Sequence, residues 1–91
     1  MCRFRDAWNT MVIACCHVVQ EGRPVLRITH DADGMWQFLC GGVHEEADAR
    51  IIALSEAAAL DVAVTRAAWL PRGWCAQRRG AHGLWLIKRK R

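Results

Sequence analysis

The segment at positions 34–46, with the sequence GMWQFLCGGVHEE, constrains the fold more than any other part of the chain. Trp36, Phe38 and Cys40 alternate onto one face, as a half-buried strand requires, and the two aromatic rings are predicted to face the core. A pair of glycines then ends the strand. The acidic residues after the glycines are typical of the first turn of a helix, where negative charge complements the helix dipole. We therefore expect a strand that gives way to a helix within a few residues.

The size and the hydrophobic content favour a single domain. The chain has 91 residues, of which 53% are hydrophobic, and this is enough for one core but not for two. Its five tryptophans are expected to supply much of that core, because each indole can bury about 150–250 Å². The predicted organisation is a loosely ordered segment over residues 1–10, a single α+β domain over 11–87, and a basic tail over 88–91.

Apolar runs and turn residues predict three strands in the first half of the chain. They cover residues 11–19, 25–30 and 35–40. The first run is continuously apolar, which is typical of a strand covered on both faces. The Asp33-Gly34 pair before the third run is a strong hairpin signal. We expect these strands to form an antiparallel meander.

Helical spacing replaces strand spacing after the glycine pair. Apolar residues spaced by four, three and four positions are Ala47, Ile51, Leu54 and Ala58. This stripe predicts a main helix over about 45–60. Asp61 is expected to cap a short second helix, and residues 74–87 are expected to form a final hairpin. The predicted fold class is α+β, with an antiparallel sheet of four to five strands, the main helix on one of its faces, and the short second helix.

The cysteine content indicates a reducing compartment. The five cysteines are Cys2, Cys15, Cys16, Cys40 and Cys75. Their number is odd and no convincing secretory signal is present, so we expect a cytoplasmic protein without a disulfide framework. No segment approaches the 18 or more apolar residues of a membrane span, so we expect no membrane partner.

Four cysteine and histidine residues form the sharpest chemical candidate. Cys15 and His17 lie two positions apart, so on a strand they would face the same way. Cys40 and His44 are spaced to converge across a turn. Two thiolates and two imidazoles would complete a tetrahedral zinc site, although the Cys-x-x-Cys signature of a zinc finger is missing. The alternative is that these cysteines are core residues, since free cysteine packs as a small hydrophobe.

Catalytic motifs are weaker. A cysteine thiolate paired with a histidine base is possible in composition, but the sequence shows no nucleophile elbow, oxyanion loop or third orienting group. Asp31 and Asp33 begin like a calcium loop without its later ligands, and Gly41-Gly42 lacks the lysine of a phosphate loop. We therefore predict no catalytic residues, no enzymatic activity and no cofactor other than the candidate zinc ion.

The basic C-terminus raises a second binding hypothesis. The formal charge is +4, and the tail supplies four cations. They are Lys88, Arg89, Lys90 and Arg91. Such a tail can bind nucleic acid through release of counterions, but a solvated chain end is the more common role.

Several short motifs resemble a known family. Asp33-Gly34-Met35-Trp36-Gln37-Phe38 followed by Gly41-Gly42 resembles a Gly-Trp-x-Phe-x-x-Gly segment. The match continues through Ile52, Leu54 and Leu60-Asp61 to Leu70-Pro71-Arg72-Gly73-Trp74-Cys75-Ala76-Gln77-Arg78. These motifs are similar to those of a bacterial family of unknown function that includes predicted immunity proteins of polymorphic toxin systems (immunity protein 33-like). Val62 stands where relatives carry proline. The resemblance implies a small cytosolic α+β protein that binds another protein and carries no catalytic residues.

The predicted function is therefore protein binding, with a toxin as one possible partner. The predicted binding surface lies at the strand-to-helix connection, where glycines allow close approach and acidic side chains can meet a basic partner. Its residues are His30, Asp31, Gly41, Gly42, His44, Glu45 and Glu46. A zinc-binding module and a weak nucleic-acid binder remain the alternatives.

Overall fold

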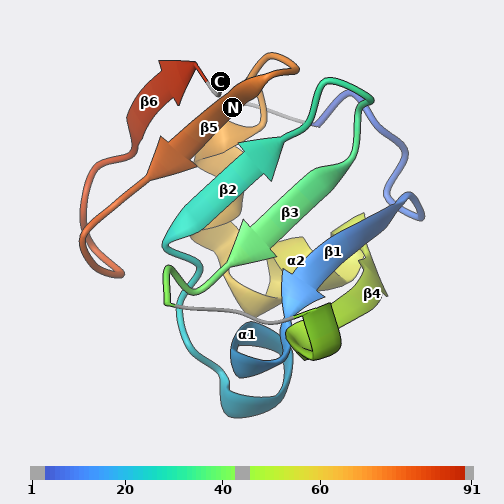
Figure 1. Cartoon of the computed structure of the whole chain (residues 1–91), viewed down its shortest axis with the longest axis vertical. Coiled ribbons are helices and arrows are strands. Elements are labelled where there is room, and N and C mark those ends of the chain that lie inside the picture. Colours follow the sequence, from blue (N-terminus) through green and yellow to red (C-terminus); the bar gives the residue numbers. More distant parts are fainter. Residues whose placement is uncertain (1–3, 43–45, 90–91) are drawn as a thin grey trace.

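A computed structural model describes residues 4–42 and 46–89 and shows a six-stranded sheet (Figure 1). Its strands are β1 (Met11–Cys15), β2 (Arg27–His30), β3 (Trp36–Leu39), β4 (Ala49–Ala53), β5 (Trp74–Gln77) and β6 (Leu86–Arg89). Their order across the sheet is β4-β1-β3-β2-β5-β6. Neighbours run antiparallel except β1 and β3, which are parallel. The α+β class is confirmed, whereas the predicted antiparallel sheet of four to five strands is instead mixed and has six.

Short helices accompany the sheet. They are α1 (Cys16–Glu21), η1 (Glu46–Asp48), α2 (Leu54–Leu60) and η2 (Val62–Ala67). In Figure 1, α2 and η2 lie behind the sheet and cover that face of it. Alternate strand residues that face the helices are buried, among them Val12, Ala14, Ile28, Trp36, Phe38 and Ala76. Within the described residues, no helix has the length and apolar character needed to cross a membrane.

The helix predicted over residues 45–60 is wrong for its first half. Residues 49–53 form the edge strand β4, paired with β1, and α2 begins only at Leu54. The adjacent β-branched pair Ile51-Ile52 favours a strand, with Ile52 buried and Ile51 exposed. At the start of α2, the Ala53 backbone N–H donates to the Glu56 carboxylate at 3.3 Å. Pairing with β1 therefore prevails over the helical spacing.

The continuous strand predicted over residues 11–19 is also wrong in its second half. β1 ends at Cys15, and residues 16–21 form α1. Gly22 ends this helix in the left-handed conformation (φ 69°), and its N–H donates to the His17 carbonyl. The apolar run of residues 11–19 is therefore divided between the strand β1 and the helix α1.

The predicted antiparallel meander needs a correction in strand order. β2 and β3 do form a hairpin, with Ile28 opposite Phe38. However, β3 lies between β1 and β2, and its partner on the other side is the parallel strand β1. This insertion places the carboxyl ends of β1 and β3 side by side.

Other expectations are confirmed. Trp36 and Phe38 are buried in the core, and β5 pairs with β6 as the final hairpin. The Asp61 carboxylate accepts a hydrogen bond from the Ala63 N–H at 3.1 Å, so Asp61 caps η2.

Both ends of the described chain belong to the fold. Phe4 is buried and packs edge-on against Trp36, with ring centroids 5.0 Å apart, so residue 4 of the predicted N-terminal segment belongs to the core. Thr10 accepts a hydrogen bond from the Leu54 N–H at 2.8 Å. Lys88 and Arg89 belong to β6 rather than to a free tail.

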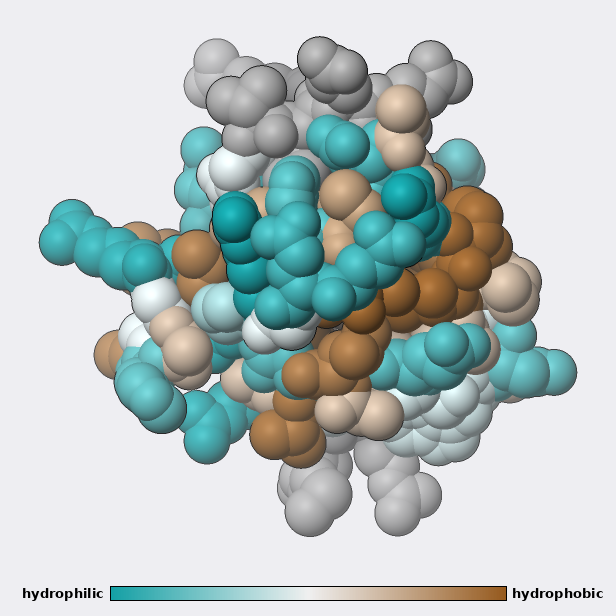
Figure 2. Space-filling view, turned by 90° about the horizontal axis from the view of Figure 1, so that it is seen from below, coloured by the Kyte–Doolittle hydropathy of each residue, from teal (hydrophilic) through white to brown (hydrophobic). Residues whose placement is uncertain are grey.

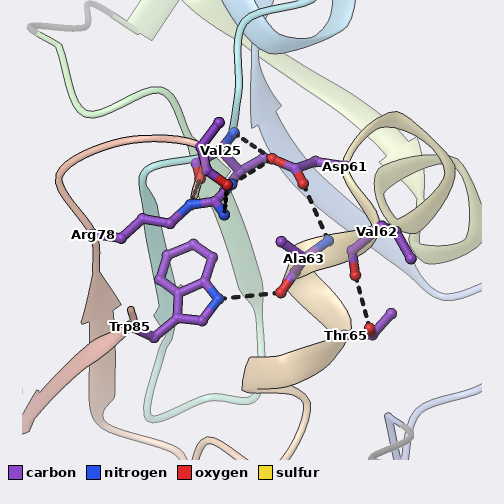
Figure 3. A network of polar contacts seen from close by, with 8 residues as sticks. Val25, Asp61, Val62, Ala63, Thr65, Arg78 and Trp85 are labelled. Atoms are coloured by element: carbon purple, nitrogen blue, oxygen red, sulfur yellow. Dashed lines mark hydrogen bonds and ion pairs between the residues drawn. The ribbon is translucent and has the colours of Figure 1, made fainter. Parts of the chain in front are cut away.

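A buried ion pair joins η2 to the end of β5 (Figure 3). Arg78 donates to the Asp61 carboxylate at 2.6 Å, to the Val25 carbonyl at 2.8 Å and to the Ala81 carbonyl at 2.8 Å. Its guanidinium also lies 4.5 Å from the centroid of the Trp85 ring. Asp61 and Arg78 each belong to a motif singled out in the sequence, and this contact gives both residues a structural role.

Candidate metal centre

Three predicted metal ligands meet where β1 and β3 end. Cys15 is the last residue of β1, His17 lies in the first turn of α1, and Cys40 follows directly after β3. Parallel neighbouring strands bring their carboxyl ends to the same edge of a sheet, and Figure 1 shows both arrows pointing toward α1. The fold thus gathers residues that are 25 positions apart in the chain (15 to 40).

The spacing of the ligand atoms suits a metal ion. One ligand atom each from Cys15, His17 and Cys40 lies within 4.8 Å of the others. The Cys40 Sγ is 3.7 Å from the His17 Nδ1. A tetrahedral ion with bonds of about 2.3 Å to sulfur and 2.0–2.1 Å to nitrogen separates its ligands by roughly 3.5–3.8 Å. The thiol–imidazole distance falls in that range, and the trio needs a contraction of at most about one ångström to complete three corners of a tetrahedron.

Burial and charge at Cys15 bear on what this cluster does. Burial raises the pKa of the Cys15 thiol above its usual value, with a further contribution from the neighbouring Cys40. A thiol with a raised pKa is a poor nucleophile, because the thiolate is the reactive form. Direct metal coordination reverses this preference, since a coordinating thiol loses its proton. A metal ion bound at this position would therefore hold Cys15 as the thiolate.

The structure brings three of the four predicted ligands together, but for a reason that differs in part from the predicted one. Cys15 and His17 do not share one face of a strand, because the strand ends between them. The turn into α1 brings them together instead. His44, the fourth predicted ligand, lies outside the described residues. Cys16 belongs to a different contact, with its Sγ 3.8 Å from the Asp48 Oδ1.

The residues predicted as a binding surface are not all neighbours. Gly41 and Gly42 follow β3 and are exposed. His30 pairs with Trp36 at the start of β3, so His30 and Asp31 lie at the opposite end of the hairpin. Of the acidic residues, Glu45 lies outside the described residues, and Glu46 is described only as the first residue of η1.

His30 and Asp31 have structural partners. The His30 ring stacks on Trp36 with centroids 3.8 Å apart, and its Nδ1 lies 2.7 Å from the Leu70 carbonyl, to which it donates when protonated there. The Asp31 carboxylate accepts a hydrogen bond from the Gln37 amide at 2.8 Å. Both residues are therefore explained by packing and turn formation.

The basic C-terminus is partly built into the sheet. Lys88 and Arg89 lie in β6, and the Arg89 guanidinium is 5.6 Å from the Trp74 ring centroid. Lys90 and Arg91 lie outside the described residues. The nucleic-acid hypothesis stays a prediction.

Sequence reasoning missed a second group of functional candidates. Arg27 and Arg79 line a surface pocket of about 300 Å³ together with Gln77 and Gly41. Only the strand pairing that sets Arg27 opposite Gln77 reveals this grouping, and no local sequence pattern signals it.

Comparison with protein-family models, with curated proteins and with solved structures finds no match to this chain. The resemblance to the immunity family therefore stays a prediction.

Proposed function

We propose that this chain is a small metal-binding domain that holds a zinc ion through Cys15, His17 and Cys40. The observation that carries the proposal is the convergence of their three ligand atoms, within 4.8 Å of one another, from β1, α1 and the end of β3. Two sulfurs and one imidazole nitrogen form a ligand set that zinc prefers. Water or a fourth side chain would complete the coordination.

The position of the cluster gives the ion a structural effect. An ion bound there would link the ends of two parallel strands to the first turn of α1. Because binding to the folded state alone stabilises that state, zinc at 100 times its dissociation constant would add about 2.7 kcal/mol. A free energy of this size is a large share of the stability of a domain this small.

Metal analysis of the purified protein tests the proposal. We expect about one zinc ion per chain, and a cobalt(II) derivative with the absorption of a tetrahedral thiolate site. Replacing Cys15 or Cys40 by serine, or His17 by alanine, is expected to weaken zinc binding by more than about 100-fold, because even outer-shell changes cost about 10–100-fold.

Cys16→Ser is the matched control, since Cys16 is adjacent in sequence yet contacts Asp48 instead. This variant should keep its zinc. Zinc binding by the His44→Ala variant tests whether His44, the fourth predicted ligand, contributes to the affinity. Equal zinc content in the wild-type protein and in the Cys15→Ser/Cys40→Ser double variant would refute the site.

A second candidate function is protein binding, as the family resemblance implies. It is favoured by the apolar outer face of β1 and β4, where Met11 pairs with Ala53 and Ile13 with Ile51. Met11 is 51% exposed and Ile51 is 59% exposed. Exposed apolar patches of this kind mark interaction sites.

Hydrophobic side chains also reach the surface at the end of the molecule where α1 lies. Figure 2 shows them as a band between hydrophilic side chains.

Ile51→Lys tests this second function. Because the Ile51 side chain is exposed, we expect a change in stability within about 0.5 kcal/mol. The same substitution should abolish protection of bacterial cells against a toxin encoded beside the gene. Replacing both Glu45 and Glu46 by lysine tests the acidic surface in the same assay. Full protection by both variants would exclude both surfaces.

A further inference from the structure

A pocket next to Gly41, where β2 begins and β5 ends, has the chemistry of an anion site. Its volume is about 300 Å³, at the lower end for small-molecule sites. The polar lining comes from Arg27 on β2, from Gln77 at the end of β5, and from Arg78 and Arg79 directly after it. Leu26 and Leu86 form apolar walls.

Two guanidinium groups of this pocket have no acidic partner among the described residues. The structure gives Arg23 an ion pair with Glu21 and Arg78 one with Asp61. Neither Arg27 nor Arg79 forms an ion pair with any residue in the described ranges. The pocket therefore concentrates positive charge that the described part of the fold does not neutralise.

Arg27 carries a second, independent signal. Its Nε is buried and has no hydrogen-bond acceptor within the described chain. A buried donor without a partner costs about 1–3 kcal/mol, and more when the group is charged. Because this Nε is shielded from solvent, a ligand can supply the acceptor once the Arg27 side chain turns toward the pocket.

The lining also indicates the class of the ligand. Two guanidinium groups match the two negative charges of a phosphate monoester better than the single charge of a carboxylate. The Gln77 amide can donate a further hydrogen bond, and the two leucines can contact an apolar group. Gly41 has a φ of +85°, and a β-carbon there would come within 3.2 Å of the Leu26 Cβ. Glycine at this position therefore leaves the side of the pocket next to Leu26 unobstructed.

From these observations we propose that the pocket formed by Arg27, Gln77 and Arg79 binds the phosphate group of a small phosphorylated organic molecule.

Nuclear magnetic resonance of the arginine Nε–H groups tests the proposal directly. Titration with phenyl phosphate is expected to shift the Arg27 signal saturably, at lower concentration than inorganic phosphate, because the leucine walls contact the ring. Benzoate, with one charge, is expected to bind more weakly. Arg79→Gln should reduce the affinity for phenyl phosphate by about 10–100-fold, the effect of one charged hydrogen bond.

The control variant is Arg23→Gln, which removes an exposed arginine outside the pocket and should leave the affinity unchanged. Arg79 is exposed, so its replacement should not disturb folding. Phosphate held by a zinc ion would behave in the opposite way: it would be lost in Cys15→Ser and kept in Arg79→Gln. That pattern, a non-saturable shift, or tighter binding of benzoate would overturn the proposal, as would equal affinities in Arg79→Gln and the wild type.

Discussion

Arg78→Met is expected to lower the free energy of unfolding by about 3–5 kcal/mol, because it leaves a partly buried carboxylate without its counter-charge. The Arg78 side chain is only 2% exposed, and it donates to Asp61, Val25 and Ala81. Methionine has a similar length, so the change removes the charge and the donors without creating a large cavity. Urea denaturation of the two proteins measures the difference.

The chain contains a matched control for this experiment. Arg23 also pairs with an acid, Glu21 at 3.3 Å, but the two side chains are 58% and 49% exposed. Exposed pairs contribute about 0–1 kcal/mol, so Arg23→Met should be nearly neutral. Equal losses in the two variants would show that the Arg78 network contributes no more than a surface pair.

A double-mutant cycle separates the pair from the rest of the network. Asp61 also accepts hydrogen bonds from the Val25 and Ala63 N–H groups, at 2.9 and 3.1 Å. Asp61→Asn in the Arg78→Met background should therefore restore part of the lost stability, because it removes the unpaired charge while keeping an acceptor. This result would show that Asp61 and Arg78 have a structural role in the fold.

The sequence predicted best the elements whose signals are local. Asp61 lies where a capping side chain is needed, and the alternation of Trp36 and Phe38 fixed which side of β3 is buried. The final hairpin followed from the glycines between its two apolar stretches. These features depend on neighbours within a few residues, so a single sequence contains the information.

The errors concern choices that depend on distant partners. Residues 49–53 have a spacing compatible with a helix, but the edge of β1 offers hydrogen bonds that make them a strand. The position of β3 between β1 and β2 likewise depends on packing of the whole sheet. No pattern within either segment distinguishes these outcomes.

The metal cluster depends both on a local signal and on a distant strand pairing. The residue types identified Cys15, His17 and Cys40 as candidates, because thiols and imidazoles are metal ligands. Their convergence depends on the parallel β1–β3 pairing, which the predicted meander did not contain. The arginine pocket had no such chemical signature, since arginines are common on surfaces and only the structure shows that the Arg27 Nε has no acceptor among the described residues.

Leu54→Asp is expected to remove a large share of the stability of the fold. Leu54 is fully buried at the start of α2, in the core between this helix and the sheet. Burying an unpaired carboxylate there should cost on the order of 4 kcal/mol or more, against a total stability of roughly 5–14 kcal/mol for 91 residues. Leu60→Asp, at the 45% exposed end of the same helix, should cost less than about 1 kcal/mol.

Ile51 distinguishes a helix from a strand over residues 49–53. If Ile51 and Leu54 belonged to one buried helical stripe, Ile51→Lys would destabilise the protein as strongly as Leu54→Asp. The β4 strand instead leaves the Ile51 side chain in solvent. Thermal denaturation of the three variants decides between them, and comparable losses at positions 51 and 54 would refute the strand.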